Sequence, residues 1–208
     1  MSNHSTTMDY LQLLDNKAFN GVSGQLNVYP TSDTDTYEAT RRTVQLMVRL
    51  VQGSRQNYQV LALCQSIWNS RYPLLAKEGS LGIIRACFDW VQNNVEFVND
   101  SALISQNKAD RELLIAPSVI LAMDHPKGDC DDFSMLIACM ISVLGINKVR
   151  FVTAGLGDNP LQFSHVYVRA WLPDRDEWVN VDCSHGPYLG WQHPLVQNNR
   201  ALVAEWEI

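Results

Sequence analysis

The sequence predicts an α+β fold, in which helices come first and an antiparallel sheet follows. Between Tyr37 and Leu144, apolar residues recur at the three- and four-residue spacing of helices. From Val149 onward they alternate with polar residues, which is the pattern of half-buried strands. Helices and strands that are separated in this way along the chain are typical of α+β domains.

Length and composition fit one domain with an ordinary hydrophobic core. The chain has 208 residues, of which 46% are hydrophobic and 18% are charged, and this excludes a disordered or collagen-like protein. Residues 1–36 are rich in Ser, Thr, Asn and Asp, with a strand-like patch at 25–29. We therefore expect an N-terminal arm or loosely ordered lead-in over 1–36 and a single domain over 37–208.

Charge and cysteine content limit the partners and the compartment. A formal net charge of −6 disfavours binding to nucleic acid or to an anionic membrane surface. The N-terminus is polar and lacks the apolar core of a signal peptide. Five cysteines, an odd number without a CxxC pair, fit reduced thiols. These features predict a soluble protein of a reducing compartment such as the cytoplasm.

Three amphipathic helices are predicted before the middle of the chain. The first begins at Tyr37 and ends at Gly53-Ser54, the second runs through residues 60–68, and the third carries the apolar stripe of residues 83–91. A short helical piece, 118–123, precedes the segment Asp124 to Asp129. The next helix, 130–144, is apolar on nearly every side, which predicts that it is buried in the centre of the domain.

Strands are predicted at residues 149–153, 164–172, 177–183 and 201–208. Pro173-Asp174-Arg175-Asp176 is a turn-forming sequence, so Leu172 should pair with Glu177. In that register His165 and Asp182 are diagonal neighbours on one face of the hairpin, within side-chain reach. A slip of one residue would place them on opposite faces.

Cys130 is the candidate nucleophile. Asp129 is a good N-cap, so Cys130 occupies the first helical position, where free N–H groups and the helix dipole favour a thiolate. The carboxylates of Asp131 and Asp132 oppose this effect, so the thiol would need a histidine partner. His165 would take the thiol proton and Asp182 would orient the imidazole. The alternative is a small buried cysteine and an unrelated His and Asp at a sheet edge.

Several segments together resemble the transglutaminase-like superfamily, in which a Cys at a helix N-terminus is followed by His and Asp on consecutive strands. The spacing is 35 residues from Cys130 to His165 and 17 more to Asp182. The resemblance covers roughly residues 80–185, and the stretch 116–128 is similar to phage and prophage members. The segments that carry it are Phe88–Phe97, Gly128–Ser134, Leu144–Ile146, Ser164–Val168 and Val179–Asp182.

This resemblance implies a papain-like core, with the nucleophile at the start of a central helix packed on an antiparallel sheet. It also implies amide chemistry through a thioester, most simply as a peptidase or amidase acting on a protein or peptide. Transfer to an amine, which cross-links proteins, is the first alternative. The second is a phage-associated binding or structural module without turnover, with phage structural proteins as partners. One oxyanion donor would be the N–H of Cys130, and Trp90, Asn93 and Asn94 are candidates for the other.

Neither a cofactor nor a metal is expected. The sequence has no phosphate-binding loop of the GxxxxGK or GxGxxG kind. Cys183 and His185, with Cys130 and His165, offer thiolate and imidazole ligands for zinc, but their spacing fits no closed zinc motif.

Overall fold

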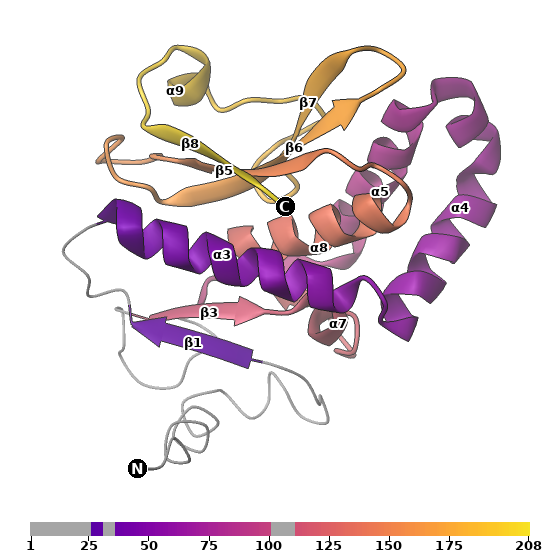
Figure 1. Ribbon diagram of the computed structural model, residues 1–208, viewed down its shortest axis with the longest axis horizontal. Coiled ribbons are helices and arrows are strands. Elements are labelled where there is room, and N and C mark those ends of the chain that lie inside the picture. The colour runs from indigo at the N-terminus through magenta and orange to yellow at the C-terminus, as the bar shows by residue number, and fades with distance from the viewer. Residues whose placement is uncertain (1–25, 31–35, 101–110) are drawn as a thin grey trace.

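The computed structural model describes residues 26–30, 36–100 and 111–208, and most of the predicted arm lies outside these ranges. Helix α8 occupies the centre, between a four-stranded sheet on one side and helices on the others (Figure 1). The helices are α3 (Thr36–Ser54), α4 (Tyr58–Glu78), α5 (Ser80–Asn94), α7 (Pro117–Ile120), α8 (Cys130–Val143) and α9 (Pro194–Gln197). This arrangement is the predicted α+β fold.

Helix α8 is central because it is apolar on nearly every side. Eleven consecutive residues, Asp131 to Ile141, are buried against α3, α4, α5 and the sheet. Each fully buried Leu, Ile or Met stabilises the fold by about 1.5–3 kcal/mol relative to an exposed side chain. The helix ends at Leu144, and Gly145 follows with φ +96°, a conformation that suits glycine.

The main sheet has the strand order β7-β6-β5-β8, and all its neighbours are antiparallel. The predicted hairpin register is confirmed, because Leu172 pairs with Glu177 and Trp171 with Trp178. The inner face of the sheet, including Val166, Val168 and Ala170, packs on α8. The strands are β5 (Val149–Ala154), β6 (His165–Leu172), β7 (Glu177–Val181) and β8 (Val203–Glu207).

Two small ladders complete the described fold. The strand-like patch near residues 25–29 is β1 (Leu26–Pro30), which pairs antiparallel with β3 (Arg111–Ile115), so this part of the lead-in is attached to the domain. Strand β2 (Glu96–Phe97) pairs in parallel with β4 (Lys127–Gly128), which comes directly before α8. The second ladder therefore places Phe97 beside the start of the central helix.

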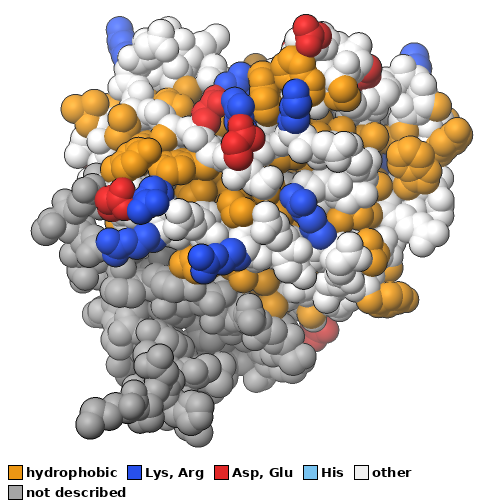
Figure 2. Space-filling view, in the orientation of Figure 1, with side chains coloured by type: hydrophobic (Ala, Val, Ile, Leu, Met, Phe, Trp, Pro, Cys, Tyr) orange, Lys and Arg blue, Asp and Glu red, His pale blue; other side chains and the backbone are white. Residues whose placement is uncertain are grey.

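The charged side chains on the outer face of the sheet are paired with one another. Arg150 bridges Glu205 and Glu207, and Arg169 also contacts Glu205. Figure 2 shows acidic and basic side chains interspersed over the visible face instead of a broad field of one sign. Among the described residues, no helix is long and apolar enough to cross a bilayer.

Candidate active site

His165 and Asp182 meet at the end of the β6–β7 hairpin. Nε2 of His165 lies 2.9 Å from Oδ2 of Asp182, and both side chains are buried. The register explains this contact, because it places the two residues diagonally on one face. Strand β7 ends at Val181, two residues before the predicted end, since Asp182 accepts hydrogen bonds that turn the chain away from β6.

The Asp182 carboxylate is held at both oxygens. Oδ1 accepts hydrogen bonds from the N–H of Ser184 (3.2 Å), the hydroxyl of Ser184 (3.1 Å) and the N–H of His185 (2.9 Å). Burial acts to raise the pKa of Asp182, but the hydrogen bond and charge of His165 and the N–H of His185 outweigh it, so the pKa is lowered. The carboxylate is therefore ionised at neutral pH and fixes the imidazole.

The other nitrogen of His165, Nδ1, is also buried. An ionised carboxylate only accepts hydrogen bonds, so Nε2 of His165 carries the proton and Nδ1 of the neutral ring is an acceptor. Within the described ranges, Nδ1 is buried and has no hydrogen-bond partner. A buried acceptor left in this way costs about 1–3 kcal/mol, so its position calls for a structural or functional reason.

Cys130 is the first residue of α8 and is only partly buried. Asp129 and Asp132 form a capping box at this helix end, in which each side chain accepts the other's N–H. Gly128 is required here, because a Cβ at that position would come within 2.5 Å of the Asp132 carboxylate. The Cys130 Sγ lies 3.9 Å from Oδ1 of the buried Asp131, whose charge disfavours a thiolate.

Two sets of contacts bring the start of α8 alongside the start of β6. The Ser134 hydroxyl lies 2.7 Å from the carbonyl oxygen of Cys130 and 3.0 Å from that of Val166, the residue after His165. The second set of contacts is a series of aromatic rings that links α8 to His165. Phe97 lies 6.0 Å from Phe133 of α8 and 5.7 Å from His185, and His185 lies 4.3 Å from His165, between ring centroids.

The other four cysteines have environments that suppress the thiolate. Burial raises the pKa of Cys64 to about 11 and that of Cys139 to about 12. Burial also raises the pKa values of Cys87 and Cys183 well above the usual range. Cys130 is the one cysteine that is not fully buried.

The candidate oxyanion donors differ in how the structure uses them. The side-chain amides of Asn93 and Asn94 donate to Asp89 and Trp90 of their own helix. Gln92, which the sequence did not single out, donates 2.7 Å to the carbonyl of Gly186 and so braces the turn after Asp182. Ser134 was also missed, although a serine four residues after Cys130 can bond back to its carbonyl. No local pattern marks Gln92.

Three groups of described side chains bring potential metal-ligand atoms within 4.8 Å of one another. They are His165 with Asp182 and His185, Asp129 with Cys130 and Asp131, and Asp100 with Asp129 and Asp132. None of them contains Cys183, whose raised pKa also disfavours the thiolate that zinc needs. Burial, followed by the charge of Asp129, raises the pKa of Asp132. The arrangement thus differs from the thiolate and imidazole set considered from the sequence.

A cysteine at the start of a central helix, packed on a sheet that carries a His–Asp pair, defines a papain-like fold. The sequence model of the Transglutaminase-like superfamily matches residues 75–183, slightly more than half of the chain. The protein belongs to this superfamily.

Several solved structures show partial similarity to the chain. LapG of Legionella pneumophila is 14% identical, with a TM-score of 0.40, over 62% of this chain and 73% of its own. A candidate protease from Parabacteroides distasonis is 17% identical, with a TM-score of 0.42, over 64% of this chain and 25% of its own. A candidate cysteine protease from Cytophaga hutchinsonii is 18% identical, with a TM-score of 0.38, over 68% and 48%.

No protein of curated function matches the sequence. The resemblance to phage and prophage members stays a prediction, as does the cytoplasmic or phage-associated location.

Proposed function

We propose that the protein is a cysteine-dependent amide hydrolase that acts on a protein or peptide, with Cys130 as nucleophile, His165 as base and acid, and Asp182 as orienting residue. The observation that carries the proposal is the buried Nδ1 of His165, which lacks a partner among the described residues. The bond from Nε2 to Asp182 fixes the tautomer in which Nδ1 accepts a proton.

The reaction follows from these roles. His165 Nδ1 takes the proton of the Cys130 thiol, and the thiolate attacks the carbonyl carbon of the substrate amide. The tetrahedral intermediate collapses with cleavage of the C–N bond, and the leaving amine takes the proton from His165. A thioester remains on Cys130. Water then attacks the thioester, gives a proton to His165 and displaces the thiolate, which recovers that proton.

Asp182 acts on this cycle through His165. The imidazole becomes a cation whenever it holds the thiol proton, and a buried ionised carboxylate 2.9 Å away stabilises that cation. Asp182 is itself ionised because its pKa is lowered, with the effects of His165 and of the N–H of His185 overcoming burial. The pair thus favours the thiolate of Cys130.

Acylation with p-nitrophenyl acetate tests the proposal without knowledge of the natural substrate. We expect a burst of about one equivalent of p-nitrophenolate and one acetyl group on the peptide that contains Cys130. Cys139→Ala should retain the burst, while Cys130→Ala should lose it. Absence of a burst from the folded wild-type protein would favour the binding module without turnover.

Competition between water and hydroxylamine for the acetylated enzyme distinguishes hydrolysis from transfer. If hydrolysis is the function, the acetyl group should be lost to water at a substantial rate without an added amine. Loss only when an amine is present would identify an acyltransferase.

A further inference from the structure

The outermost strand of the main sheet leaves part of its backbone unpaired. Strand β7 is at one end of the order β7-β6-β5-β8. The N–H of Trp171 donates to the carbonyl of Lys148, on the β5 side of β6. Trp171 and Trp178 are therefore a non-hydrogen-bonded pair of the antiparallel ladder, and the N–H and C=O of Trp178 point away from β6.

A second hydrogen bond confirms this direction independently. The N–H of Gly190 donates 3.0 Å to the carbonyl of Asn180, so the backbone of Asn180 also points outward. Asn180 is two residues from Trp178, as the alternation of the ladder requires. Among the described residues, the N–H and C=O of Trp178 and the N–H of Asn180 have no backbone partner.

The open edge is bounded at both ends. At the hairpin turn, the Asp174 carboxylate accepts hydrogen bonds from the N–H and the hydroxyl of Ser80, which ties the turn to the start of α5. At the other end, Gly190 bonds to Asn180. The edge between Glu177 and Asn180 is about 10 Å long, at about 3.3 Å per residue, which is room for a short extended segment.

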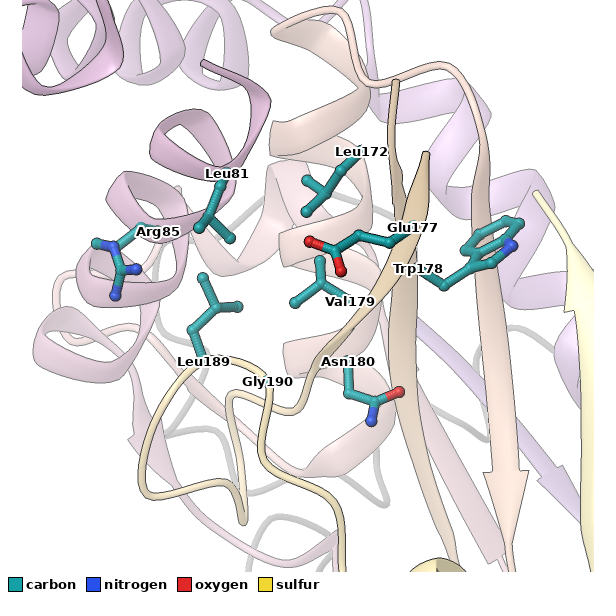
Figure 3. Close-up of a pocket in the computed structure, with 9 residues that line it drawn as sticks. All are labelled: Leu81, Arg85, Leu172, Glu177, Trp178, Val179, Asn180, Leu189 and Gly190. Carbon is teal, nitrogen blue, oxygen red and sulfur yellow. The ribbon is translucent and has the colours of Figure 1, made fainter. Parts of the chain in front are cut away.

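A cavity of about 320 Å³ lies against this edge, between β7 and α5 (Figure 3). This volume is at the lower end of the range of ligand sites, about 300–1,000 Å³. Leu81, Leu172, Val179 and Leu189 line it with apolar side chains that converge from α5, the hairpin and the loop after it. A side chain that projects from a strand laid along β7 would enter this apolar space.

The charges around the cavity favour a basic side chain. The carboxylate of Glu177 points among the apolar side chains in Figure 3. Arg85, the cation of the lining, is paired with Glu78 at 2.9 Å, whereas Glu177 has no ion pair among the described residues. A lysine or arginine can lay its methylene stem over leucines and reach a carboxylate with its charged end.

We propose that this groove binds an extended peptide as an added strand on β7, with a lysine or arginine side chain in the cavity. Strand addition uses the backbone for affinity and a side-chain pocket for selectivity. The site is separate from Cys130, so it would hold a protein partner or substrate whether or not the proposed amide chemistry occurs.

Binding of fluorescein-labelled Thr-Val-Lys-Val-Thr amide, followed by anisotropy, tests the charge requirement. Two further peptides carry arginine or glutamate in place of the central lysine. We expect the lysine and arginine peptides to bind at least about tenfold more tightly than the glutamate peptide. Glu177→Gln should remove this discrimination. Asp158→Asn, which neutralises an exposed carboxylate outside the cavity lining, should preserve it. Equal binding of all peptides to the wild-type protein would overturn the proposal.

Backbone pairing needs its own measurement. N-methylation of the peptide should weaken binding at alternate residues only, and hydrogen exchange of the Trp178 and Asn180 amides should slow on binding. Tolerance of every N-methyl group, or a dimer in which the same edge is covered by a second copy, would contradict strand addition. Cys130→Ala should bind the lysine peptide normally, so loss of acyl chemistry and loss of peptide binding are scored separately.

Discussion

Helix α8 carries two cysteines, one at its first position and one inside its buried stretch, and the two lie in opposite environments. Cys130 is the first residue, beside the capping box of Asp129 and Asp132, and is partly exposed. Cys139 lies in the third turn, fully buried, with its Sγ 3.7 Å from the carbonyl of Val51. Burial raises the pKa of Cys139 to about 12.

The difference shows that position along the helix decides what a thiol can do. At the N-terminal end, N–H groups without helical partners favour negative charge, and the Nδ1 of His165 is available as an acceptor at the start of the neighbouring strand. Further along, the helix offers apolar neighbours and saturated backbone groups. The same side chain is therefore a candidate nucleophile at the start of the helix and a core residue in its third turn.

The largest expected effect is on the nucleophile itself. Cys130→Ala should reduce the rate of acetylation at least about a thousandfold, because the other four thiols are buried. Cys139→Ala should leave the rate within about twofold, because its sulfur fills space in the core and makes one weak hydrogen bond. If the burst persists in Cys130→Ala and is lost in Cys139→Ala, Cys139 and not Cys130 is the nucleophile.

Removing the orienting carboxylate should have the next largest effect. In Asp182→Asn the amide can offer its own oxygen or its N–H₂ to His165, but it cannot stabilise the imidazolium. We expect acetylation to fall about 100- to 10,000-fold while the fold is retained, as judged by circular dichroism. An unchanged rate would show that the buried His–Asp pair has only a structural role.

A pair of serines on α8 tests the contact that fixes the reactive end. Ser134→Ala removes the hydroxyl whose single proton is shared between the carbonyls of Cys130 and Val166, so the free energy of unfolding should fall by about 1–3 kcal/mol. Acetylation should slow several-fold as the helix loses its register with β6. Ser142→Ala, near the other end of α8, loses a hydrogen bond from Arg55 and should cost about 0.5–1.5 kcal/mol of unfolding free energy, but it should leave the acetylation rate unchanged. Equal effects of the two substitutions on the acetylation rate would contradict a special role of Ser134 at the reactive end of α8.

The smallest effect concerns acid stability. The pKa of Asp182 is lowered in the folded state, so its stabilisation is present above the unfolded value, about 3.9, and is lost as the pH falls through the folded pKa. Urea midpoints of wild type and Asp182→Asn should therefore differ most near neutrality and converge in acid. Asp158→Asn serves as the control. A gap that stays constant with pH would show that the ionised carboxylate does not contribute.

Much of the fold could be predicted because its main elements have strong periodicity. The apolar helix at Cys130 and the hairpin closed by Pro173–Asp176 lie where the sequence placed them. Helix α4 is longer than predicted and continues through Pro73, because Leu75 is buried and the N–H of Gly79 bonds to its carbonyl. The ladders of β1 with β3 and β2 with β4 depend on partners distant in sequence.

In the candidate site, too, local contacts could be predicted from the sequence, whereas contacts between distant segments could not. The approach of His165 to Asp182 follows from hairpin register, which local turn residues specify. The role of Phe97, which lies beside Gly128 and contacts both Phe133 and His185, depends on the long-range pairing of β2. Nor does any local pattern indicate that Gln92 reaches the turn after Asp182. These residues are fixed by tertiary packing.

The most direct test of the central claim is the rate of iodoacetamide labelling of each native cysteine against pH, located by peptide mass mapping, in wild type and His165→Ala. Cys130 should label fastest, with an apparent pKa well below the unperturbed value of about 8.5, and His165→Ala should lose this advantage. The four buried thiols should react only on unfolding. If Cys130 labels no faster than Cys64 or Cys87, or if its profile is unchanged in His165→Ala, the proposed pairing of thiol and imidazole is contradicted.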